Sequence, residues 1–336
     1  MVKFRMPAEW EPHEATWLTW PKDPVTFPGK VLAKVEETYI EMILGLTPGE
    51  KVHLLVDDEK TQGRVLKKVE EKGSSKNLTI HLIKTVDVWM RDYGPIFVKG
   101  DKVKMTKWIF NAWGGKYEEL MKDNSVVDSM APYLGMDVER PGIILEGGSI
   151  DVNGRGTLLT TEQCLLNKNR NKELSKAQIE KHLSDNLGVS RFVWLKEGIA
   201  GDDTDGHIDD IARFVDKRTI LCAYETDRND KNYAILRRNF LDLEDARDQD
   251  GEPFEVKPLR MPGPILHKGA RLPASYANFY IGNKAVLLPV FGHKNDSAAV
   301  SLLTEHFGGR KIIPIDCGPL VHGLGAIHCV TQQQPL

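Results

Sequence analysis

Four hairpin-like segments, spread along the chain, constrain the fold more than any other feature of this sequence. In each segment an apolar strand meets a short polar turn and a second apolar strand begins: PIFV-KGDK-VKM, SIDV-NGRG-TLLTT, ARFV-DKR-TILCAY and NFYI-GNK-AVLLPVF. Gly, Asn or Asp occupies the turn positions that need a positive φ. The turns lie near residues 100, 154, 217 and 283, and this spacing leaves room for one helix in each repeat.

Helical patterns fill the gaps between the hairpins. Ser175 and Gln178 stand at the two ends of a capping box, and Gly188 is placed to end the helix that follows. Four further segments have a helical pattern: 30–46, 117–134, 232–246 and 295–307. The polar stretch 225–257 contains one of these helices and then an exposed loop, so it does not indicate a domain boundary.

The two ends of the chain supply a fifth unit. The C-terminal segment GAIHCVTQQQP would be completed by the N-terminal strand ATWLTWP. If these segments pair, the repeats close into a ring around one shared core. Length alone would suggest about two domains, but this closure predicts an α/β fold with a single domain over residues 1–336.

The chemically distinctive residues occupy the same place in successive repeats. Asp92, Glu146 and His207 each precede a hairpin turn by a similar distance, and Cys329 lies in the final repeat. Equivalent positions in a closed ring converge on its axis. We therefore expect two carboxylates, an imidazole and a thiol to meet in the middle of the molecule.

The four cysteines lie far apart and have no CxxC spacing, which argues against a disulfide framework or a zinc site. A cysteine in an apolar strand is more often buried and inert than reactive, and Cys164 and Cys222 fit that interpretation. Cys317, in IDCGP, lies in a loop context and is the one rival of Cys329 for reactivity.

His207 lies in GDDTDGHIDD, where five of the ten residues are aspartates. A solvated acidic loop with Asx turns is the ordinary interpretation of such a run, and no EF-hand frame fits it. Asp205, His207 and Asp209 read DxHxD, which could bind a divalent metal as in manganese ureohydrolases. No second motif of that kind occurs in the chain, so we predict no metal. Glu146 could likewise cap a turn.

A guanidinium group would suit the predicted set of side chains. Two aspartates that face one cavity repel each other unless a cation pairs with both, and guanidinium is planar and matches carboxylates. A thiolate aimed at its central carbon, with a histidine to move protons, would displace ammonia without any metal or organic cofactor. The same acidic surroundings would raise the thiol pKa, so Cys329 is expected to ionise only when the cation binds.

Composition excludes several classes of protein. Lys and Arg number 45 and Asp and Glu 48, so the net charge of −3 lacks the basic excess of a nucleic-acid binder. No apolar run approaches the roughly 18 residues that span a bilayer, and the N-terminus has no secretory apolar region. We expect a soluble cytoplasmic protein with no nucleic-acid or membrane partner.

Seven segments between about residue 8 and residue 335 resemble the agmatine deiminases. They are EWEPHEATWLTWP, VWMRDYGPIFV, NAWGGKY, EGGSIDVNGRGTLLTTEQCLL, GDDTDGHIDDIARF, ASYANFYIGN and GAIHCVTQQQP. That family belongs with the bacterial-type peptidylarginine deiminases in the guanidine-modifying superfamily. The resemblance implies a five-fold pseudo-symmetric α/β propeller (pentein), built of hairpin-helix-strand repeats around a central channel. This agrees with the four hairpins and the closing unit.

The resemblance also implies a catalytic set. Cys329 would be the nucleophile that forms a covalent amidino-cysteine (thiouronium) intermediate. His207 would protonate the leaving ammonia and then activate the water that hydrolyses the intermediate. Glu146 would hold that histidine and contact a guanidinium nitrogen.

Four substrate-binding residues follow from the same resemblance. Asp92 and Asp209 would clamp the guanidinium, Trp89 would form an aromatic wall of the substrate channel, and Asp203 would contact the amine end. The glycine run that many relatives have before IHC is interrupted here by Leu324 and Ala326. The backbone near the substrate tail is therefore expected to differ.

The resemblance implies hydrolysis of agmatine to N-carbamoylputrescine and ammonia, a step in putrescine and polyamine metabolism. An arginine or peptidyl-arginine deiminase is the alternative with the same chemistry; it would need a basic residue, such as Arg91 or Arg271, for the substrate carboxylate. A metal-dependent agmatinase-like ureohydrolase and a non-catalytic guanidine-binding protein are the further alternatives. The sequence leaves open whether the chain forms a homo-oligomer.

Overall fold

The computed structural model describes residues 4–336, and each of the four predicted hairpins is an antiparallel pair of strands. In each unit a third strand runs parallel to the second one. These four three-stranded sheets are β4(Ile96–Lys99), β5(Val103–Thr106) and β6(Val138–Glu139); β7(Asp151–Val152), β8(Thr157–Thr161) and β9(Arg191–Leu195); β10(Ala212–Phe214), β11(Thr219–Tyr224) and β12(Glu255–Arg260); β15(Tyr280–Ile281), β16(Ala285–Val290) and β17(Lys311–Asp316).

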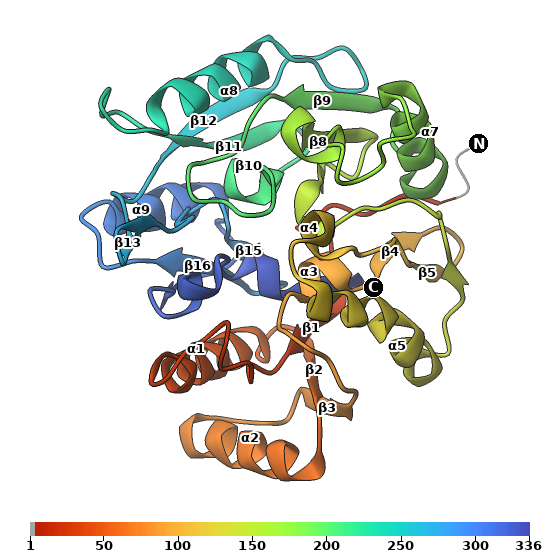
Figure 1. Cartoon of the computed structure of the whole chain (residues 1–336), viewed down its shortest axis with the longest axis vertical. Coiled ribbons are helices and arrows are strands. Elements are labelled where there is room, and N and C mark those ends of the chain that lie inside the picture. The colour runs from red at the N-terminus through yellow and green to blue at the C-terminus, as the bar shows by residue number, and fades with distance from the viewer. Residues whose placement is uncertain (1–3) are drawn as a thin grey trace.

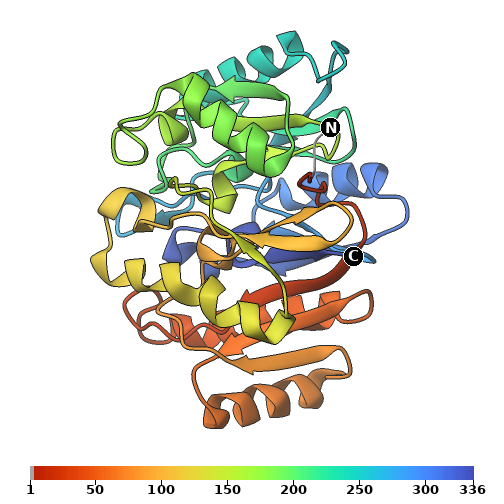
Figure 2. The same cartoon turned by 90° about the vertical axis from the view of Figure 1, so that its right-hand side faces the viewer.

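The fifth sheet joins the two ends of the chain, as predicted. The C-terminal strand β18 pairs antiparallel with the N-terminal strand β1, and β2 and β3 continue the sheet in parallel. Figure 2 shows β1, in red, beside the blue C-terminal part of the chain. The strands of this sheet are β1(His13–Thr19), β2(Lys51–Val56), β3(Leu78–Leu82) and β18(Gln332–Pro335). A separate two-stranded sheet consists of β13(Leu266–His267) and β14(Ala270–Arg271).

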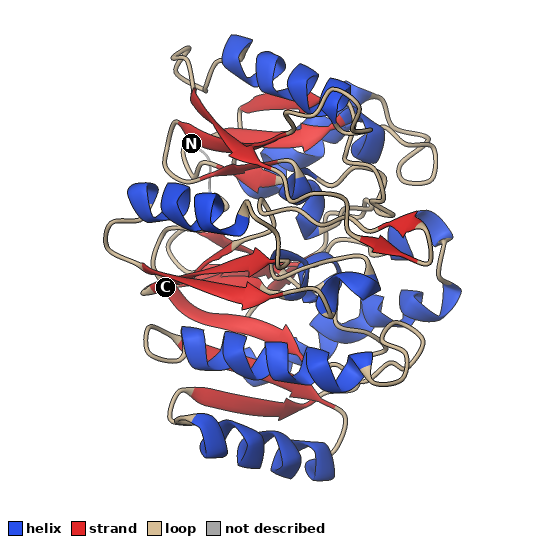
Figure 3. Cartoon of the chain, turned by 90° about the vertical axis from the view of Figure 1, so that its left-hand side faces the viewer, coloured by secondary structure: helices blue, strands red, loops and turns tan. Residues whose placement is uncertain are grey.

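Helices connect the strands within each unit and lie mostly at the outside of the molecule (Figure 1). Figure 3 shows the strands in layers, with helices between and outside them. The longer helices are α1(Val31–Leu46), α2(Glu59–Lys72), α5(Val126–Leu134), α7(Lys176–Leu187), α8(Tyr233–Asp245) and α9(Asp296–His306), and the short ones include α4(Ala112–Gly115) and α6(Glu162–Leu165). Within residues 4–336, no helix is long and apolar enough to cross a lipid bilayer.

Local sequence signals account for the ends of these helices. The capping box of α7 forms as predicted, with Ser175 and Gln178 satisfying each other's backbone N–H groups, and Gly188 ends the helix at φ 68°. The prediction of one helix over residues 117–134 was wrong in its first half. Residues Glu118–Ser125 form a 3-10 helix, and α5 begins only at Val126.

Buried apolar side chains lie in several separate clusters, so the prediction of one shared core was wrong. The first contains Trp17, Tyr39 and Val88, and others lie against α7, α8 and α9. The physical reason is that buried polar and charged side chains occupy the region where the units meet, among them Glu9 and Arg213. Such groups are tolerated in an interior only when they are paired.

A short helical turn precedes the first strand of four of the five sheets. These turns are α3(Met90–Tyr93) before β4, η2(Gly147–Ser149) before β7, η3(Ile208–Asp210) before β10 and η5(His328–Val330) before β18. Turn α3 contacts both η5 and η2, and η2 contacts η3. Figure 1 shows α3 near the middle of the molecule. The repeated turns therefore bring four distant parts of the chain together.

Candidate active site

The turns carry the residues that the sequence patterns singled out. Asp92 lies within α3, Glu146 and His207 are the residues directly before η2 and η3, and Cys329 lies within η5. All four side chains are at least nine-tenths buried. These residues share a place in the sequence, ahead of a hairpin, and in the structure they share a place in or beside one of the short turns that meet.

Cys329 is held by a residue that the sequence patterns did not single out. The Asn278 side chain donates from Nδ2 to the Cys329 Sγ at 3.1 Å, and its Oδ1 accepts from the backbone N–H of Cys329 at 3.3 Å. Asn278 begins the fourth hairpin-like segment and lies five residues before Asn283, whereas Asp92, Glu146 and His207 lie seven to nine residues before their turns. Its place in the segment ASYANFYIGN was the signal that could have found it.

The Cys329 thiol is surrounded by acidic groups. Its Sγ donates to the Oδ2 of Asp209 at 3.8 Å. Burial, and then the charges of Asp209, Asp210 and Asp92, raise the pKa of this thiol well above its ordinary value. Its neutral form is therefore the resting form at pH 7, as the acidic motifs predicted.

Asp92 and Asp209 differ in their protonation. Asp92 accepts from the Trp113 Nε1 at 2.9 Å and from the Gly148 N–H at 3.0 Å. Burial, and then the charges of Asp209 and Glu146, raise the pKa of Asp92 well above its ordinary range. For Asp209, burial favours the neutral form, but the hydrogen bond and charge of His328 outweigh it and lower the pKa.

His207 is buried and has no hydrogen-bond partner for either ring nitrogen among residues 4–336. Its Nδ1 lies 3.8 Å from the Oδ1 of Asp92. Burial lowers the pKa of His207 to about 3, although the charges of nearby carboxylates such as Asp209 act to raise it. The imidazole is therefore neutral at pH 7 and has a lone pair free to accept a proton.

Glu146 does not hydrogen-bond to His207. Its Oε1 accepts from the Arg170 Nε at 2.6 Å, and both side chains are fully buried. Arg170 also donates to Asp205 at 2.9 Å. The Oε2 of Glu146 has no hydrogen-bond partner in the described part of the chain. Arg170 was missed because nothing in its local sequence, NKNRNKE, indicates a buried residue.

Gly148 is the point at which three of these side chains converge. A Cβ atom at this position would lie 2.6 Å from the His207 Nδ1, 2.9 Å from the Asp92 Oδ1 and 3.0 Å from the Asp209 Oδ2. The first two distances are shorter than real Cβ atoms show, and the third is tighter than most real Cβ contacts. The absence of a side chain at Gly148 therefore allows these three polar atoms to lie close together.

A cavity of about 880 Å³ leads to Cys329, and Trp89, Asp92 and Asp203 also line it. Trp89 packs edge-to-face against Trp113, with ring centroids 6.3 Å apart. His207, Glu146 and Asp209 are buried and do not line the cavity. The wall is acidic, with seven carboxylate side chains: Asp23, Asp57, Asp87, Asp92, Glu118, Glu119 and Asp203.

Asp203 lies at an exposed part of this wall. Its Oδ2 accepts from the Tyr117 hydroxyl at 2.5 Å, and its Oδ1 lies 3.7 Å from the Lys116 Nζ. Lys116 also donates to Asp205 at 2.9 Å, so this lysine is shared between the two carboxylates. The carboxylate is thus placed by two neighbours and still faces the cavity.

Basic residues that could receive a substrate carboxylate lie elsewhere. Within residues 4–336, no arginine lines the cavity, and Lys22 is its one lysine. Arg91 is buried and donates to Glu9 and Gln333, and Arg271 donates to Asp230 at 2.6 Å. Neither arginine is placed to receive a ligand in this cavity.

Leu324 and Ala326, which interrupt the glycine run, both lie next to the site. Leu324 lines the cavity and adopts φ 71°, a left-handed conformation that costs a non-glycine residue roughly 1–2 kcal/mol. Between them, a Cβ at Gly325 would lie 2.4 Å from the Trp89 ring and 3.1 Å from the Cys329 Cβ. The remaining glycine therefore permits the contact between nucleophile and aromatic wall.

One group of potential metal ligands occurs in the described residues. Single ligand atoms of Glu146, Cys164 and His207 lie within 4.8 Å of one another, and all three residues are buried. The Arg170 guanidinium already contacts Glu146, so a metal ion there would meet a fixed positive charge. The DxHxD motif does not form such a group because Asp205 pairs with Lys116 and Arg170.

The other cysteines are free and buried. Cys164 and Cys222 fit the prediction of inert positions, although Cys164 lies beside His207. Cys317 lies in a loop, as expected, but its burial argues against it as a rival nucleophile. Cys317 directly follows β17, its side chain is fully buried in an apolar cluster, and burial raises its pKa well above the ordinary value.

Comparison with known proteins decides the family. The sequence profile of the Porphyromonas-type peptidyl-arginine deiminases matches residues 5–335. The chain belongs to this family. A curated Legionella pneumophila protein named "Putative agmatine deiminase" is 38% identical over 337 residues, which cover 99% of this chain and 95% of that protein. Membership in the Porphyromonas-type family confirms the resemblance drawn from the seven sequence segments.

Solved structures of similar proteins have the same α/β fold. The agmatine deiminase of Enterococcus faecalis is 32% identical, with a TM-score of 0.91 over 99% of this chain and 96% of the other. A Porphyromonas gingivalis structure described as a "Putative Arginine Deiminase" is 36% identical, with a TM-score of 0.91 over 99% and 98%. These comparisons therefore establish the α/β fold and the deiminase family. The two relatives are named after different substrates, agmatine and arginine.

Proposed function

We propose that this chain is an agmatine deiminase, which hydrolyses agmatine to N-carbamoylputrescine and ammonia. The observation that carries the proposal is the acidic cavity that leads to Cys329, with seven carboxylates and no arginine in its wall among the described residues. Agmatine presents a guanidinium at one end and an ammonium at the other, so carboxylates favour both ends. The names of the Legionella and Enterococcus relatives support the same substrate.

In the proposed reaction Cys329 attacks the guanidinium carbon. The neutral His207 ring takes the thiol proton, the S–C bond forms, and the proton then passes to the leaving nitrogen, so that the C–N bond breaks and ammonia departs. Next, His207 takes a proton from water, whose oxygen bonds to the same carbon. Breaking the S–C bond returns the thiol and releases the ureido product. The free lone pair and buried position of His207 support this role.

The remaining residues bind and orient the substrate. Asp92 and Asp209 would accept hydrogen bonds from the guanidinium. The Oδ1 of Asp209, which has no partner among residues 4–336, supports this for one of them. The unpartnered Oε2 of Glu146 would accept another, while Arg170 holds its Oε1. Trp89 would pack beside the guanidinium plane.

Arginine is the second candidate substrate, and the name of the P. gingivalis relative favours it. Its carboxylate would meet the acidic wall of the cavity without a cationic partner other than Lys22. Desolvating a carboxylate beside like charges is unfavourable, so the wall disfavours both arginine and peptides that end in arginine.

The proposal is tested by measuring the formation of ammonia and of the ureido product, with EDTA present throughout. The substrates compared are agmatine, arginine and a peptide with C-terminal arginine. Turnover of agmatine alone is expected. Cys329→Ala should abolish it, whereas the matched control Cys222→Ala, which alters a buried cysteine of β11, should retain it. Turnover of the arginine substrates would instead favour the second candidate. Urea release that stops with EDTA would overturn the mechanism.

Three further parts of the proposal concern the whole molecule. We infer that the five sheets form a five-fold propeller in one domain, which their common strand order supports. We also propose a cytoplasmic enzyme of putrescine biosynthesis, since its product would be a carbamoylated diamine. Sedimentation of the purified protein will decide whether the chain is a monomer or a homo-oligomer.

A further inference from the structure

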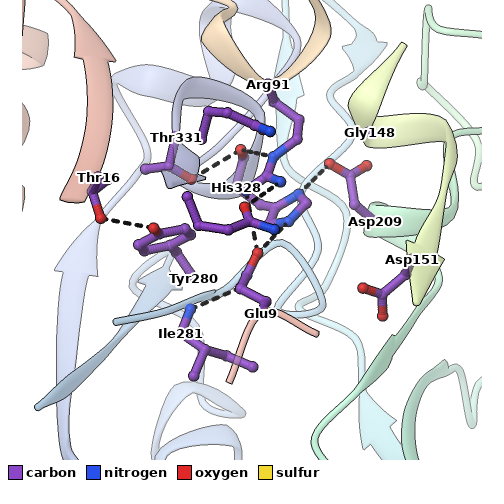
Figure 4. A network of polar contacts seen from close by, with 12 residues as sticks. Glu9, Thr16, Arg91, Gly148, Asp151, Asp209, Tyr280, Ile281, His328 and Thr331 are labelled. Atoms are coloured by element: carbon purple, nitrogen blue, oxygen red, sulfur yellow. Dashed lines mark hydrogen bonds and ion pairs between the residues drawn. The ribbon is translucent and has the colours of Figure 1, made fainter. Parts of the chain in front are cut away.

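His328, the residue before the proposed nucleophile, is hydrogen-bonded at both ring nitrogens to carboxylates. Its Nδ1 lies 2.7 Å from the Oδ2 of Asp209, and its Nε2 lies 2.9 Å from the Oε2 of Glu9. The side chain is 2% exposed, and both contacts are drawn in Figure 4. No step of the proposed reaction uses this residue.

The hydrogen bonds limit the possible charges of the ring. An ionised carboxylate can only accept, so each ring nitrogen that faces one must carry a proton. Burial opposes ionisation of Glu9, but Arg213, His328 and Arg91 outweigh it, and its pKa lies well below the ordinary range. Arg213 and Arg91 also donate to Glu9, so the ionised form of Glu9 does not depend on His328 alone. Asp209 and His328 share one proton between Oδ2 and Nδ1, and the arrangement with an ionised Asp209 makes the ring an imidazolium.

Glu9 is a fixed anchor for this cation. Its Oε1 accepts from the Arg213 guanidinium at 2.8 Å and from the Ile281 N–H at 2.8 Å, and its Oε2 accepts from Arg91 at 3.2 Å. The residues that supply these donors come from α3, β10 and β15, and Figure 4 shows Glu9 below the ring. A carboxylate with this many donors does not move freely, so the ring of His328 is fixed too.

The other partner of the ring faces the reacting groups. The Oδ2 of Asp209 accepts from His328 and lies 3.8 Å from the Cys329 Sγ, while its Oδ1 is buried with no partner in residues 4–336. Without a neighbouring cation, an aspartate beside Asp92 and Asp210 would bind a proton, as burial and like charge dictate. A protonated Asp209 would carry no negative charge to pair with a guanidinium.

We propose that His328 is a positioning residue, an imidazolium that links Glu9 to Asp209 and keeps the Asp209 carboxylate ionised and oriented beside Cys329. The proposal rests on the proposed function, in which Asp209 binds the guanidinium. His328 itself contacts neither substrate nor the reacting carbon. It makes one oxygen of Asp209 a fixed acceptor and leaves the other oxygen for the ligand.

Several further charged or titratable groups face this pair from neighbouring elements. They are Arg91 on α3, Asp151 on β7, Arg213 on β10, Asp92 on α3, Asp202 and His207 before η3, Asp210 on η3 and Cys329 on η5. The two arginines favour ionised carboxylates, and the aspartates oppose them. The His328 imidazolium is the cation that directly contacts Asp209.

Nitrogen NMR of the wild-type protein, labelled with ¹⁵N-histidine, tests the charge without any substitution. We expect both ring nitrogens of His328 to carry protons at pH 8, where an ordinary histidine of pKa about 6.5 is roughly 97% neutral. A neutral His328 ring at pH 8 would overturn the proposal. This measurement does not depend on which substrate the enzyme uses.

A binding experiment tests the consequence for Asp209. Agmatine binding to Cys329→Ala protein, which cannot turn over, is measured by calorimetry at pH 6 and pH 9, with and without His328→Gln. The glutamine can donate to one carboxylate but has no charge. The Kd should rise roughly tenfold or more at pH 6, as for the loss of a charged hydrogen bond, and less at pH 9, where Asp209 ionises unaided.

His81→Gln, which alters a buried histidine stacked on Trp17, is the matched control and should leave the Kd unchanged at both pH values. A purely structural role of His328 would change the Kd equally at pH 6 and pH 9, and that result would overturn the proposal. If Cys329→Ala protein binds no agmatine at all, the proposed function fails, and the NMR result alone decides the charge of His328.

Discussion

The sulfur of Cys329 lies 3.8 Å from the Oδ2 of Asp209, with the thiol as the donor. This contact places a proposed nucleophile directly beside an ionised carboxylate. Such a neighbour disfavours the thiolate, and burial disfavours it further, so the thiol pKa is raised. The enzyme therefore rests with a neutral thiol until a cationic ligand offsets the carboxylate charge.

Alkylation by neutral iodoacetamide measures this state. At pH 7 Cys329 should react more slowly than an ordinary thiol of pKa about 8.5. The rate should rise only as the pH increases beyond that value, because a raised pKa moves thiolate formation to higher pH. Asp209→Asn should make the reaction at pH 7 faster. A fast reaction of the free wild-type enzyme at pH 7, absent in Cys329→Ala, would contradict the proposed resting state.

Glu146→Gln tests the buried ion pair with Arg170. Removing one charge leaves the guanidinium buried with Asp205 as its remaining carboxylate, and breaking a buried pair costs roughly 3–5 kcal/mol. The free energy of unfolding in urea should fall by about that amount, and turnover of agmatine should fall as well.

Glu162→Gln is the matched control for this substitution. Glu162 also pairs with cations, Lys176 and Lys196, but all three side chains are partly exposed. Exposed pairs contribute about 0.2–1 kcal/mol, so the control should change stability little. Equal effects of the two substitutions would show that the Glu146 pair is no stronger than a surface one.

Gly148→Ala tests the convergence of side chains at η2. The new Cβ would push apart His207, Asp92 and Asp209, and misplacing reacting groups by about 1 Å costs roughly a hundredfold in rate. The kcat for agmatine should fall by that order. Gly63→Ala is the control, since Gly63 lies in α2 and a methyl group added there would have no atom within 4 Å, and it should leave kcat unchanged.

Asp203→Asn tests the proposed contact with the substrate ammonium. The side chain is partly exposed, so the lost interaction is worth about 0.2–1 kcal/mol. A free energy of this size corresponds to a rise in the KM for agmatine of up to about fivefold, while kcat should stay unchanged. Asp137→Asn, on the surface beside Lys102, is the control. A fall in kcat with KM unchanged would move Asp203 from the substrate tail to the chemistry.

Local patterns predicted most of the fold. The hairpin turns and helix ends depend on residues close together in sequence, such as Ser175, Gln178 and Gly188, and these formed as predicted. The closing pair of β1 and β18 followed from counting the repeats. The positions of Cys329, His207 and Asp92 on central turns followed from their common place in each repeat. Their catalytic roles stay predictions.

The partners of these residues could not be predicted because they come from distant parts of the chain. Glu9 contacts Arg91, Arg213 and His328, which are 82, 204 and 319 residues away. Its local sequence, PAEWEP, has no feature of a buried ion-pair site. The buried pair of Glu146 and Arg170 was hidden in the same way. Such pairs depend on how the units pack against each other.

The most direct test of the proposed mechanism is the covalent state of Cys329 during turnover. The enzyme is mixed with agmatine, quenched in acid within its first turnovers and measured by intact-protein and peptide mass spectrometry. We predict a peptide containing Cys329 whose mass has increased by that of agmatine less one ammonia, and no such increase for Cys329→Ala. Steady release of ammonia and ureido product, with Cys329→Ala as active as the wild type, would contradict the mechanism.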